Sequence, residues 1–222
     1  MTELAERKRG TAQAPQHETA KRAADVVISL AAIAILIPLL LPLWLLVRST
    51  SKGPALFRQE RLGRNKRPFT LLKLRTMYTD NDDRIHRDYV AGLLSSDGAA
   101  VPGASGLFKL DADPRVTPLG AWLRRTSLDE LPQLINVLKG EMSLVGPRPV
   151  LSWEADLFGQ PYQQRFTVKP GITGLWQVSG RSRLSMRDAL QLDVEYVTRR
   201  SFMFDLAILF RTVPALFGGG AR

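Results

Sequence analysis

The chain is 222 residues long, 45% of them hydrophobic, and it carries a formal net charge of +10. This length favours one globular core together with one membrane element and leaves little room for two large domains. Because there is no cysteine, disulfides and thiolate metal sites are excluded, and the composition fits a reducing compartment. The positive charge indicates an anionic partner, such as nucleic acid, acidic lipid or a phosphorylated small molecule.

The first part of the chain combines a polar tail with a long apolar run. Residues 1–20 mix basic, polar and small residues without apolar periodicity, which predicts a disordered basic tail. The run from Val26 to Val47 has no charge and exceeds the roughly 20 residues that a membrane helix needs. A cleaved secretory signal is the alternative, but the run is too long and no small-residue cleavage site follows Trp44.

Basic residues flank the apolar run on both sides. Lys21 and Arg22 precede it, and the residues that follow it include Arg48, Lys52, Arg58, Arg61, Arg64, Lys66 and Arg67. The positive-inside rule therefore places both ends in the cytoplasm. Pro38 and Pro42 remove backbone donors and bend a helix. We expect residues 21–50 to form a re-entrant membrane helix, with a kinked membrane span as the alternative.

Residues 51–222 are expected to form one soluble domain of short elements separated by turns. Helices are predicted over Met77–Val90, Leu131–Lys139, Trp153–Gln160 and Met186–Arg199. The small and glycine-rich residues from Gly92 to Gly106 predict a mobile loop. The apolar stretch from Phe202 to Phe217 is too short to span a membrane, so it is expected either at the membrane interface or in the core.

An acidic pair beside two arginines is the densest chemical signal in the chain. Ser127 and Glu130 fit a capping box, which is the purely structural interpretation. The functional one is that Asp129, next to Arg124 and Arg125, stays ionised and attacks phosphorus as a nucleophile. Glu130 is then a candidate ligand for Mg²⁺, a hard cation bound by one or two carboxylates and substrate phosphates.

The other acidic pairs and both histidines lack so basic a setting. Asp82-Asp83, Asp111/Asp113 and Asp193/Glu195 are expected on solvated helix faces or in turns. His17 lies in the polar tail and His86 in a charged run, so neither is expected to be a ligand or a base.

Two rigid loops each present an arginine. Arg148 lies between Pro147 and Pro149, which favours a fixed guanidinium that can bind phosphate oxygens, although a plain turn has the same pattern. A second loop runs from Pro170 to Arg181. Upstream, Lys73-Leu74-Arg75 adds cations to the same pocket or supplies the polar positions of a strand.

Taken together, these segments resemble the monotopic phosphoglycosyl transferases, bacterial sugar transferases that start exopolysaccharide, capsule and glycan assembly on undecaprenyl phosphate. The resemblance covers nearly the whole chain after Lys21. Its motifs are Lys21-Arg22 with Asp25, Gly53-Pro54 with Phe57, Gln59, Arg61 and Gly63, Lys73 to Met77, Asp113 to Thr117, Thr126 to Gln133, Gly146 to Pro149, and Pro170 to Arg181. One departure is Ile37-Pro38 with a second proline at 42, where some members have serine before proline.

The resemblance implies an α/β fold, mainly helical with a small sheet, in which a re-entrant membrane helix precedes a cytoplasmic catalytic domain with interfacial helices. It implies Asp129 as the nucleophile, Glu130 as its Mg²⁺-associated partner and Lys73 as a basic catalytic residue. The substrate-binding residues expected from the motifs are Arg75, Arg124, Arg125, Pro147, Arg148 and Arg181.

The implied reaction moves a sugar 1-phosphate from a UDP-sugar to polyprenyl phosphate at the bacterial inner membrane and releases UMP. The expected partners are therefore UDP-sugar, polyprenyl phosphate and membrane lipid, and not nucleic acid. The sugar and a homo-oligomeric state stay open. Two rivals remain: a membrane-tethered basic binding module without catalysis, and an ordinary glycosyltransferase, which would release UDP.

Overall fold

The computed structural model describes residues 15–79, 84–95, 113–180 and 184–217. Most of the expected tail and of the Gly92–Gly106 loop lies outside these residues. Pro15 to Ala20, which the sequence analysis assigned to the tail, belong to the first described helix.

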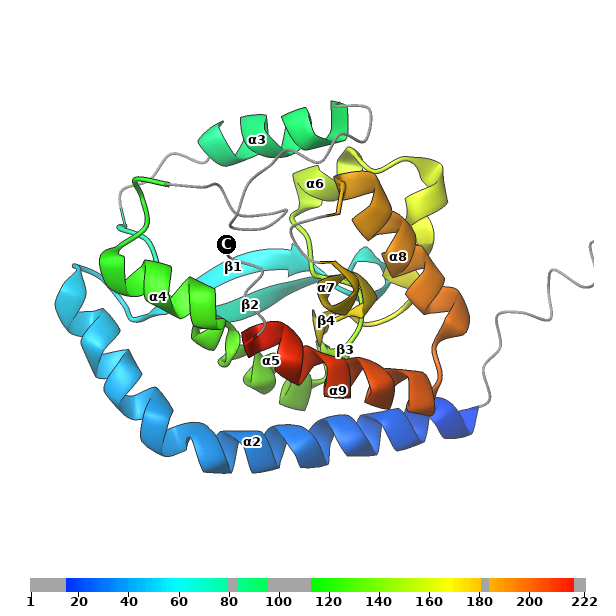
Figure 1. The fold of residues 1–222 in the computed structure, drawn as a ribbon, viewed down its shortest axis with the longest axis horizontal. Coiled ribbons are helices and arrows are strands. Elements are labelled where there is room, and N and C mark those ends of the chain that lie inside the picture. The colour runs from blue at the N-terminus through cyan, green and yellow to red at the C-terminus, as the bar shows by residue number, and fades with distance from the viewer. Residues whose placement is uncertain (1–14, 80–83, 96–112, 181–183, 218–222) are drawn as a thin grey trace, which may run out of the picture.

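That helix, α2 (Pro15–Thr50), runs along one side of the molecule (Figure 1). In the described part of the chain it is the one helix long and apolar enough to cross a membrane. The helix continues through Pro38 and Pro42 and changes direction in the half that contains them. Each proline removes a backbone donor and crowds the preceding turn, which accounts for the bend.

Both ends of α2 are attached to the rest of the protein. Near its start, Lys21 Nζ lies 2.6 Å from a carboxylate oxygen of Asp205. One helical turn later, Asp25 Oδ1 accepts the backbone N–H of Leu144 at 3.1 Å. Near its end, Val47 is fully buried in a small core cluster. The helix is therefore held by the same domain at both ends.

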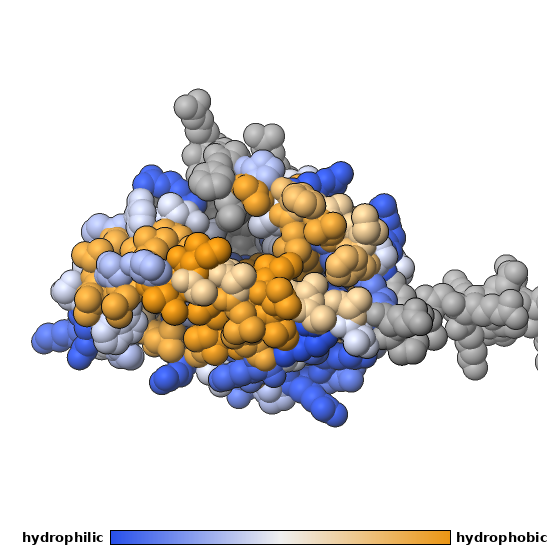
Figure 2. All heavy atoms as spheres, turned by 90° about the horizontal axis from the view of Figure 1, so that it is seen from below, coloured by the Kyte–Doolittle hydropathy of each residue, from blue (hydrophilic) through white to orange (hydrophobic). Residues whose placement is uncertain are grey.

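Between these attachments, α2 exposes a broad apolar surface. Its exposed large side chains are Val27, Ile28, Leu30, Ile35, Ile37, Leu39, Leu41, Trp44, Leu45 and Leu46. Figure 2 shows this apolar area on the lower face of the molecule, bordered by hydrophilic side chains. An exposed apolar patch of this kind marks a membrane or protein contact.

The described strands form two small sheets. Strands β1 (Leu56–Leu62) and β2 (Pro68–Leu74) are antiparallel and are joined through the 3₁₀ turn η1 (Arg64–Lys66). Strands β3 (Ser143–Val145) and β4 (Gly171–Thr173) are parallel. The expectation of a mainly helical chain is confirmed, but the single small sheet is replaced by two separate pairs of strands.

Short helices make up most of the domain. They are α3 (Arg84–Ser95), α4 (Pro118–Thr126), η2 (Leu128–Glu130), α5 (Gln133–Lys139), α6 (Ser152–Asp156), η3 (Gln160–Thr167), α7 (Leu175–Ser179), α8 (Met186–Arg199) and α9 (Phe202–Phe217). Helix α8 has the predicted bounds, and α5 ends at Gly140 as expected, with φ +82°.

Three predicted helices have different bounds. Helix α5 begins at Gln133, two residues after the predicted Leu131. The helix expected from Met77 begins only at Arg84, because Met77 forms a bridge with Val116 and the Tyr78 N–H donates to the Arg115 carbonyl at 2.9 Å. Helix α6 ends at Asp156, short of the predicted Gln160, where the separate 3₁₀ helix η3 begins.

Helix α9 packs in the core on one face, and its placement at the membrane interface stays a prediction. Ile208 is buried in a core cluster with residues of β2, α5, β3 and α8. Phe202, Met203, Phe210 and Val213 are exposed. One face of α9 therefore packs in the core and the other is apolar and exposed.

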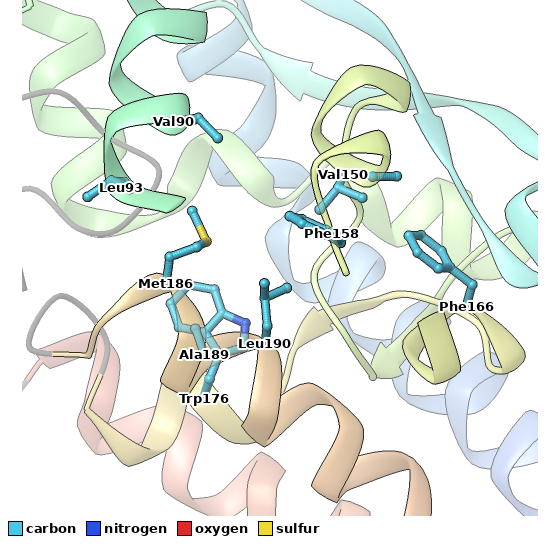
Figure 3. Packing of buried hydrophobic residues seen from close by; sticks show 10 residues of the cluster. Val90, Leu93, Val150, Phe158, Phe166, Trp176, Met186, Ala189 and Leu190 are labelled. Atoms are coloured by element: carbon cyan, nitrogen blue, oxygen red, sulfur yellow. The ribbon is translucent and has the colours of Figure 1, made fainter. Parts of the chain in front are cut away.

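A second core cluster joins α3 to α6, η3, α7 and α8. In Figure 3, Met186 extends from α8 toward Val90 and Leu93 of α3, and the Trp176 ring of α7 lies on its other side. This cluster sets the position of α8, on which the buried charge described next depends.

A buried ion pair joins η3 to α8. Arg165 and Asp193 are 2% and 3% exposed, and Arg165 Nη2 lies 2.6 Å from Asp193 Oδ2. Burial raises the pKa of Asp193, while the neighbouring guanidinium opposes that shift. The expectation that Asp193 lies on a solvated helix face is therefore wrong, because η3 packs over it. Glu195 is more exposed and pairs with Arg199 within α8.

We expect Asp193→Asn to lower the free energy of unfolding by about 3–5 kcal/mol, because it leaves the Arg165 charge buried without a counter-charge. Glu195→Gln makes the same chemical change in an exposed pair and should alter it by less than about 1 kcal/mol. Denaturant unfolding of the purified variants measures both values. Equal effects of the two substitutions would contradict a structural role for the buried pair.

Candidate active site

A sharp turn positions the acidic pair. Helix α4 ends at Ser127, whose backbone is left-handed with φ +57°, and η2 then carries Asp129 and Glu130. Such a conformation costs a non-glycine residue roughly 1–2 kcal/mol. The Ser127 side chain makes no capping hydrogen bond, so the capping-box interpretation is wrong. The turn instead places the carboxylates of Asp129 and Glu130 between α4 and α5.

Glu130 is held by two cations from distant parts of the chain. Lys73 Nζ at the end of β2 lies 3.0 Å from Glu130 Oε1, and Arg148 Nη1 lies 3.4 Å from the same oxygen. All three side chains are 15–19% exposed, so the cluster is largely buried but still open to solvent. The predicted residues Lys73, Glu130 and Arg148 therefore meet in one place.

Asp129 is buried beside Arg124. Burial lowers the pKa of the Arg124 guanidinium, and the nearby carboxylates of Asp129 and Asp113 oppose that shift. Arg124 Nε donates to Thr76 Oγ1 at 2.9 Å, which holds the guanidinium in place. A fixed positive charge next to a buried carboxylate favours its ionised form.

The loop that carries Arg148 is rigid for reasons beyond its two prolines. Pro147 and Pro149 are buried, and the Pro147 carbonyl accepts the Gly171 N–H at 2.9 Å. Arg165 Nη2 donates to the Arg148 carbonyl at 2.7 Å. The buried Arg165–Asp193 pair thus positions the backbone of Arg148. Nothing in the sequence pattern distinguished Arg165 from a surface arginine.

The two predicted arginine loops lie against each other. A Cβ added to Gly171 would lie 2.1 Å from the backbone nitrogen of Gly146, and one added to Gly146 would lie 2.5 Å from the Lys169 carbonyl oxygen. Glycine is required at both positions because the backbones are in contact. Arg181, at the end of the second loop, lies outside the described residues.

Arg75, one of the predicted substrate-binding residues, contacts the end of α2 and not the acidic pair. Arg75 is buried, and its Nη2 donates to the carbonyls of Val47 at 3.1 Å and Ser51 at 2.7 Å, next to the end of α2. Burial and the like charge of Arg48 lower the pKa of Arg75. Arg125 is exposed. The structure therefore gathers Lys73, Arg124 and Arg148 around the carboxylates, and the roles predicted for Arg75 and Arg125 stay predictions.

The remaining acidic pairs lie outside this cluster where they are described. Asp113 is a turn residue, as expected, and is paired with Arg115 at 2.8 Å. Hydrogen bonding to Arg115 lowers the pKa of Asp113. Asp82, Asp83 and Asp111 lie outside the described residues.

Comparison with known proteins relates this site to a family. The chain matches the model of the family described as bacterial sugar transferase over residues 16–219. It is 41% identical over 196 residues to the exopolysaccharide production protein ExoY of Sinorhizobium fredii, which covers 88% of this chain and 84% of that protein.

Two further relatives carry names that state a reaction. The undecaprenyl-phosphate galactose phosphotransferase of Salmonella typhimurium is 41% identical over 196 residues, 88% of this chain and 40% of that protein. The UDP-glucose:undecaprenyl-phosphate glucose-1-phosphate transferase of Caulobacter vibrioides is 41% identical over 204 residues, which cover 88% of this chain and 69% of that protein. This chain thus spans most of ExoY but less than half of the Salmonella protein. From the match over nearly its whole length, the chain belongs to the bacterial sugar transferase family.

Proposed function

We propose that this protein transfers a sugar 1-phosphate from a UDP-sugar to polyprenyl phosphate and releases UMP, as the first membrane step of exopolysaccharide or glycan assembly. The observation that carries the proposal is the buried carboxylate of Asp129 beside Arg124, next to a Glu130 held by Lys73 and Arg148. The names of the Salmonella and Caulobacter relatives support a lipid phosphate as the acceptor.

Asp129 acts as the nucleophile in this proposal. Its carboxylate oxygen forms a bond to the sugar-bearing phosphorus while the bond from that phosphorus to the UMP oxygen breaks. An oxygen of the lipid phosphate then attacks the same phosphorus, and the Asp129 carboxylate leaves. The neighbouring Arg124 supports this role, because a nearby positive charge favours the anionic form of a carboxylate.

The cations around the pair receive the substrate's negative charge. Arg148 presents a guanidinium fork on a backbone fixed by Arg165, which suits bidentate contact with phosphate oxygens. Glu130 neutralises part of the charge of Lys73 and Arg148 before substrate binds and keeps both side chains in the site. Such preorganised charge stabilises a transition state more than flexible surface cations do.

Magnesium is the cofactor in this proposal, with Glu130 as its protein ligand. Within the described residues, no group of three or more His, Asp or Glu side chains could hold a metal by itself. The adjacent carboxylates of Asp129 and Glu130 suit Mg²⁺, which usually takes one or two carboxylates and completes its shell with substrate phosphates. When bound, the ion would neutralise the charge of the diphosphate.

The re-entrant placement of α2 is the membrane part of the proposal. Both ends of α2 are bound to the same domain, through Lys21 and Asp25 at one end and Val47 at the other. A folded domain lies on one side of a bilayer, so both ends belong on that side. The basic flanks of the helix favour the cytoplasmic side of the inner membrane.

We expect Asp129→Asn to reduce UMP release by at least about a thousandfold, because it removes the attacking carboxylate. Asp156→Asn changes an exposed aspartate on α6 in the same way and should leave turnover unchanged. The assay supplies UDP-galactose or UDP-glucose with undecaprenyl phosphate and Mg²⁺ and identifies the released nucleotide. A folded Asp129→Asn variant with near-normal turnover would exclude this nucleophile, and release of UDP would support an ordinary glycosyltransferase.

Arg148→Ala should lower kcat/KM for the UDP-sugar by about tenfold or more, the value of a lost charge-assisted contact. Arg125→Ala removes an equal charge from an exposed position and should cost less. Steady-state kinetics with varied UDP-sugar compares the two. If Arg125→Ala lowers kcat/KM more than Arg148→Ala does, the diphosphate lies on the Arg125 side of α4 and not on the Arg148 side.

Topology can be tested cleanly because the chain has no cysteine of its own. We expect Thr19→Cys and Thr50→Cys to be shielded from a membrane-impermeant maleimide in intact cells and labelled after lysis. Replacing Pro38 and Pro42 with Leu should straighten α2 and move the N-terminus outward in a fraction of molecules. Labelling of Thr19→Cys from outside, without the proline changes, would show an ordinary membrane span.

A further inference from the structure

A polar recess lies at the N-terminal end of α2. It is lined by the first turns of α2, by η1, by the start of β3, by Val168 and Lys169 before β4 and by the end of α8, and none of Lys73, Asp129, Glu130 or Arg148 borders it. Five cations line it, which are Lys21, Arg22, Arg64, Lys169 and Arg200, against the two carboxylates of Glu18 and Asp25. The lining therefore has an excess of positive charge.

Lys21 and Arg22 already have hydrogen-bond or ion-pair partners, whereas Lys169 has none among the described residues. Lys21 pairs with Asp205 at 2.6 Å, and Arg22 donates to the carbonyls of Val137 and Leu138 at the end of α5. Lys169 is half-buried and makes no hydrogen bond or ion pair with the described residues. Its pKa is lowered by burial and by the like charges of Arg22 and Arg64, and the carboxylates of Asp25 and Glu18 oppose that shift only in part. An anion in the recess would compensate both effects.

Two further polar groups of the recess lack partners within the described residues. Ser143 is completely buried, and its hydroxyl makes no hydrogen bond. Both ring nitrogens of His17 are buried and unbonded. Buried polar groups are normally hydrogen-bonded, so these exceptions call for a ligand. A hydroxyl, an imidazole and an ammonium together supply donors, which fits the oxygens of a phosphate group.

The recess lies at the edge of the apolar surface. Val27 and Ile28, two residues after Asp25, are the first exposed apolar side chains of α2. With the apolar face in the bilayer, the recess would sit at the depth of the lipid phosphates. We propose that it is a phosphate-binding site, separate from the catalytic cluster, that takes the headgroup of an acidic phospholipid. The lipid source rests on the proposed membrane placement of α2, whereas the affinity for phosphate does not.

Native mass spectrometry of the full-length protein in detergent, titrated with phosphatidylglycerol or phosphatidylcholine, tests this site. We expect one phosphatidylglycerol to be retained preferentially and Lys169→Gln to weaken that binding by about tenfold. Lys139→Gln removes the same charge from an exposed residue outside the recess and should have no effect. The Asp129→Asn variant should still bind the lipid even though it no longer transfers sugar phosphate. Loss of lipid binding and loss of transfer can therefore be told apart, and each proposal can fail without the other.

A parallel titration with inorganic phosphate, followed by thermal unfolding, distinguishes the source of the phosphate. The alternative outcome is that inorganic phosphate raises Tm only when Lys169 is present, while phosphatidylglycerol and phosphatidylcholine bind equally. That result would overturn the lipid assignment and leave a site for soluble phosphate. If Lys169→Gln does not fold, Ser143→Ala takes its place, with an expected loss of about threefold or more. Binding that neither Lys169→Gln nor Ser143→Ala changes, with either probe, would overturn the site.

Discussion

The attachment of α2 to the domain at both ends is the constraint on which the rest of the molecule depends. The Asp205 carboxylate joins three helices, because one oxygen accepts from Lys21 of α2 at 2.6 Å and the other accepts the Tyr196 hydroxyl of α8 at 2.8 Å. Burial and this carboxylate raise the pKa of Tyr196, so the hydroxyl stays a donor. A buried charge pair is tolerated only where further hydrogen bonds satisfy it, and this one has them. The apolar surface of α2 is therefore presented from one side of the domain.

The same attachment determines where chemistry can occur. The acidic pair lies on a turn between α4 and α5, and Lys73, Arg124 and Arg148 reach it from other parts of the chain. In the proposed reaction the diphosphate donor is soluble and the lipid phosphate is not, so a site that serves both must lie at a membrane surface. A domain bound to both ends of an apolar helix is consistent with that requirement.

Features with a local signal could be predicted from the sequence. The charge-free run Val26–Val47 within α2, the helical period of α8 and the end of α5 at Lys139 each depend on a few neighbouring residues, and the structure has all three. The acidic pair and the arginine loops each had a local signal, and the resemblance of their motifs agreed with it. Lys73 and Glu130 are distant in the chain, and the structure places them 3.0 Å apart.

Burial and partner choice could not be predicted in the same way. Asp193 has the spacing of a solvated position on an amphipathic helix, and only the packing of η3 over α8 places Arg165 against it. From the sequence alone, Arg75 is expected together with Lys73, either as a cation of the same pocket or at a polar position of a strand. Strand β2 ends at Leu74, however, and Arg75 instead reaches the end of α2. Both differences arise from contacts between segments far apart in the chain.

The position of Arg75 links the end of α2 to the charged cluster around Glu130. Lys73 and Arg75 are two residues apart, and the first binds Glu130 while the second binds the carbonyls of Val47 and Ser51. A displacement of the end of α2 would therefore pull on the segment that holds Lys73. The bend at Pro38 and Pro42 determines where that end lies relative to the start of the helix. The contacts of Lys73 and Arg75 thus join the ion pairs of Glu130 to the end of α2 through nearby residues of the chain.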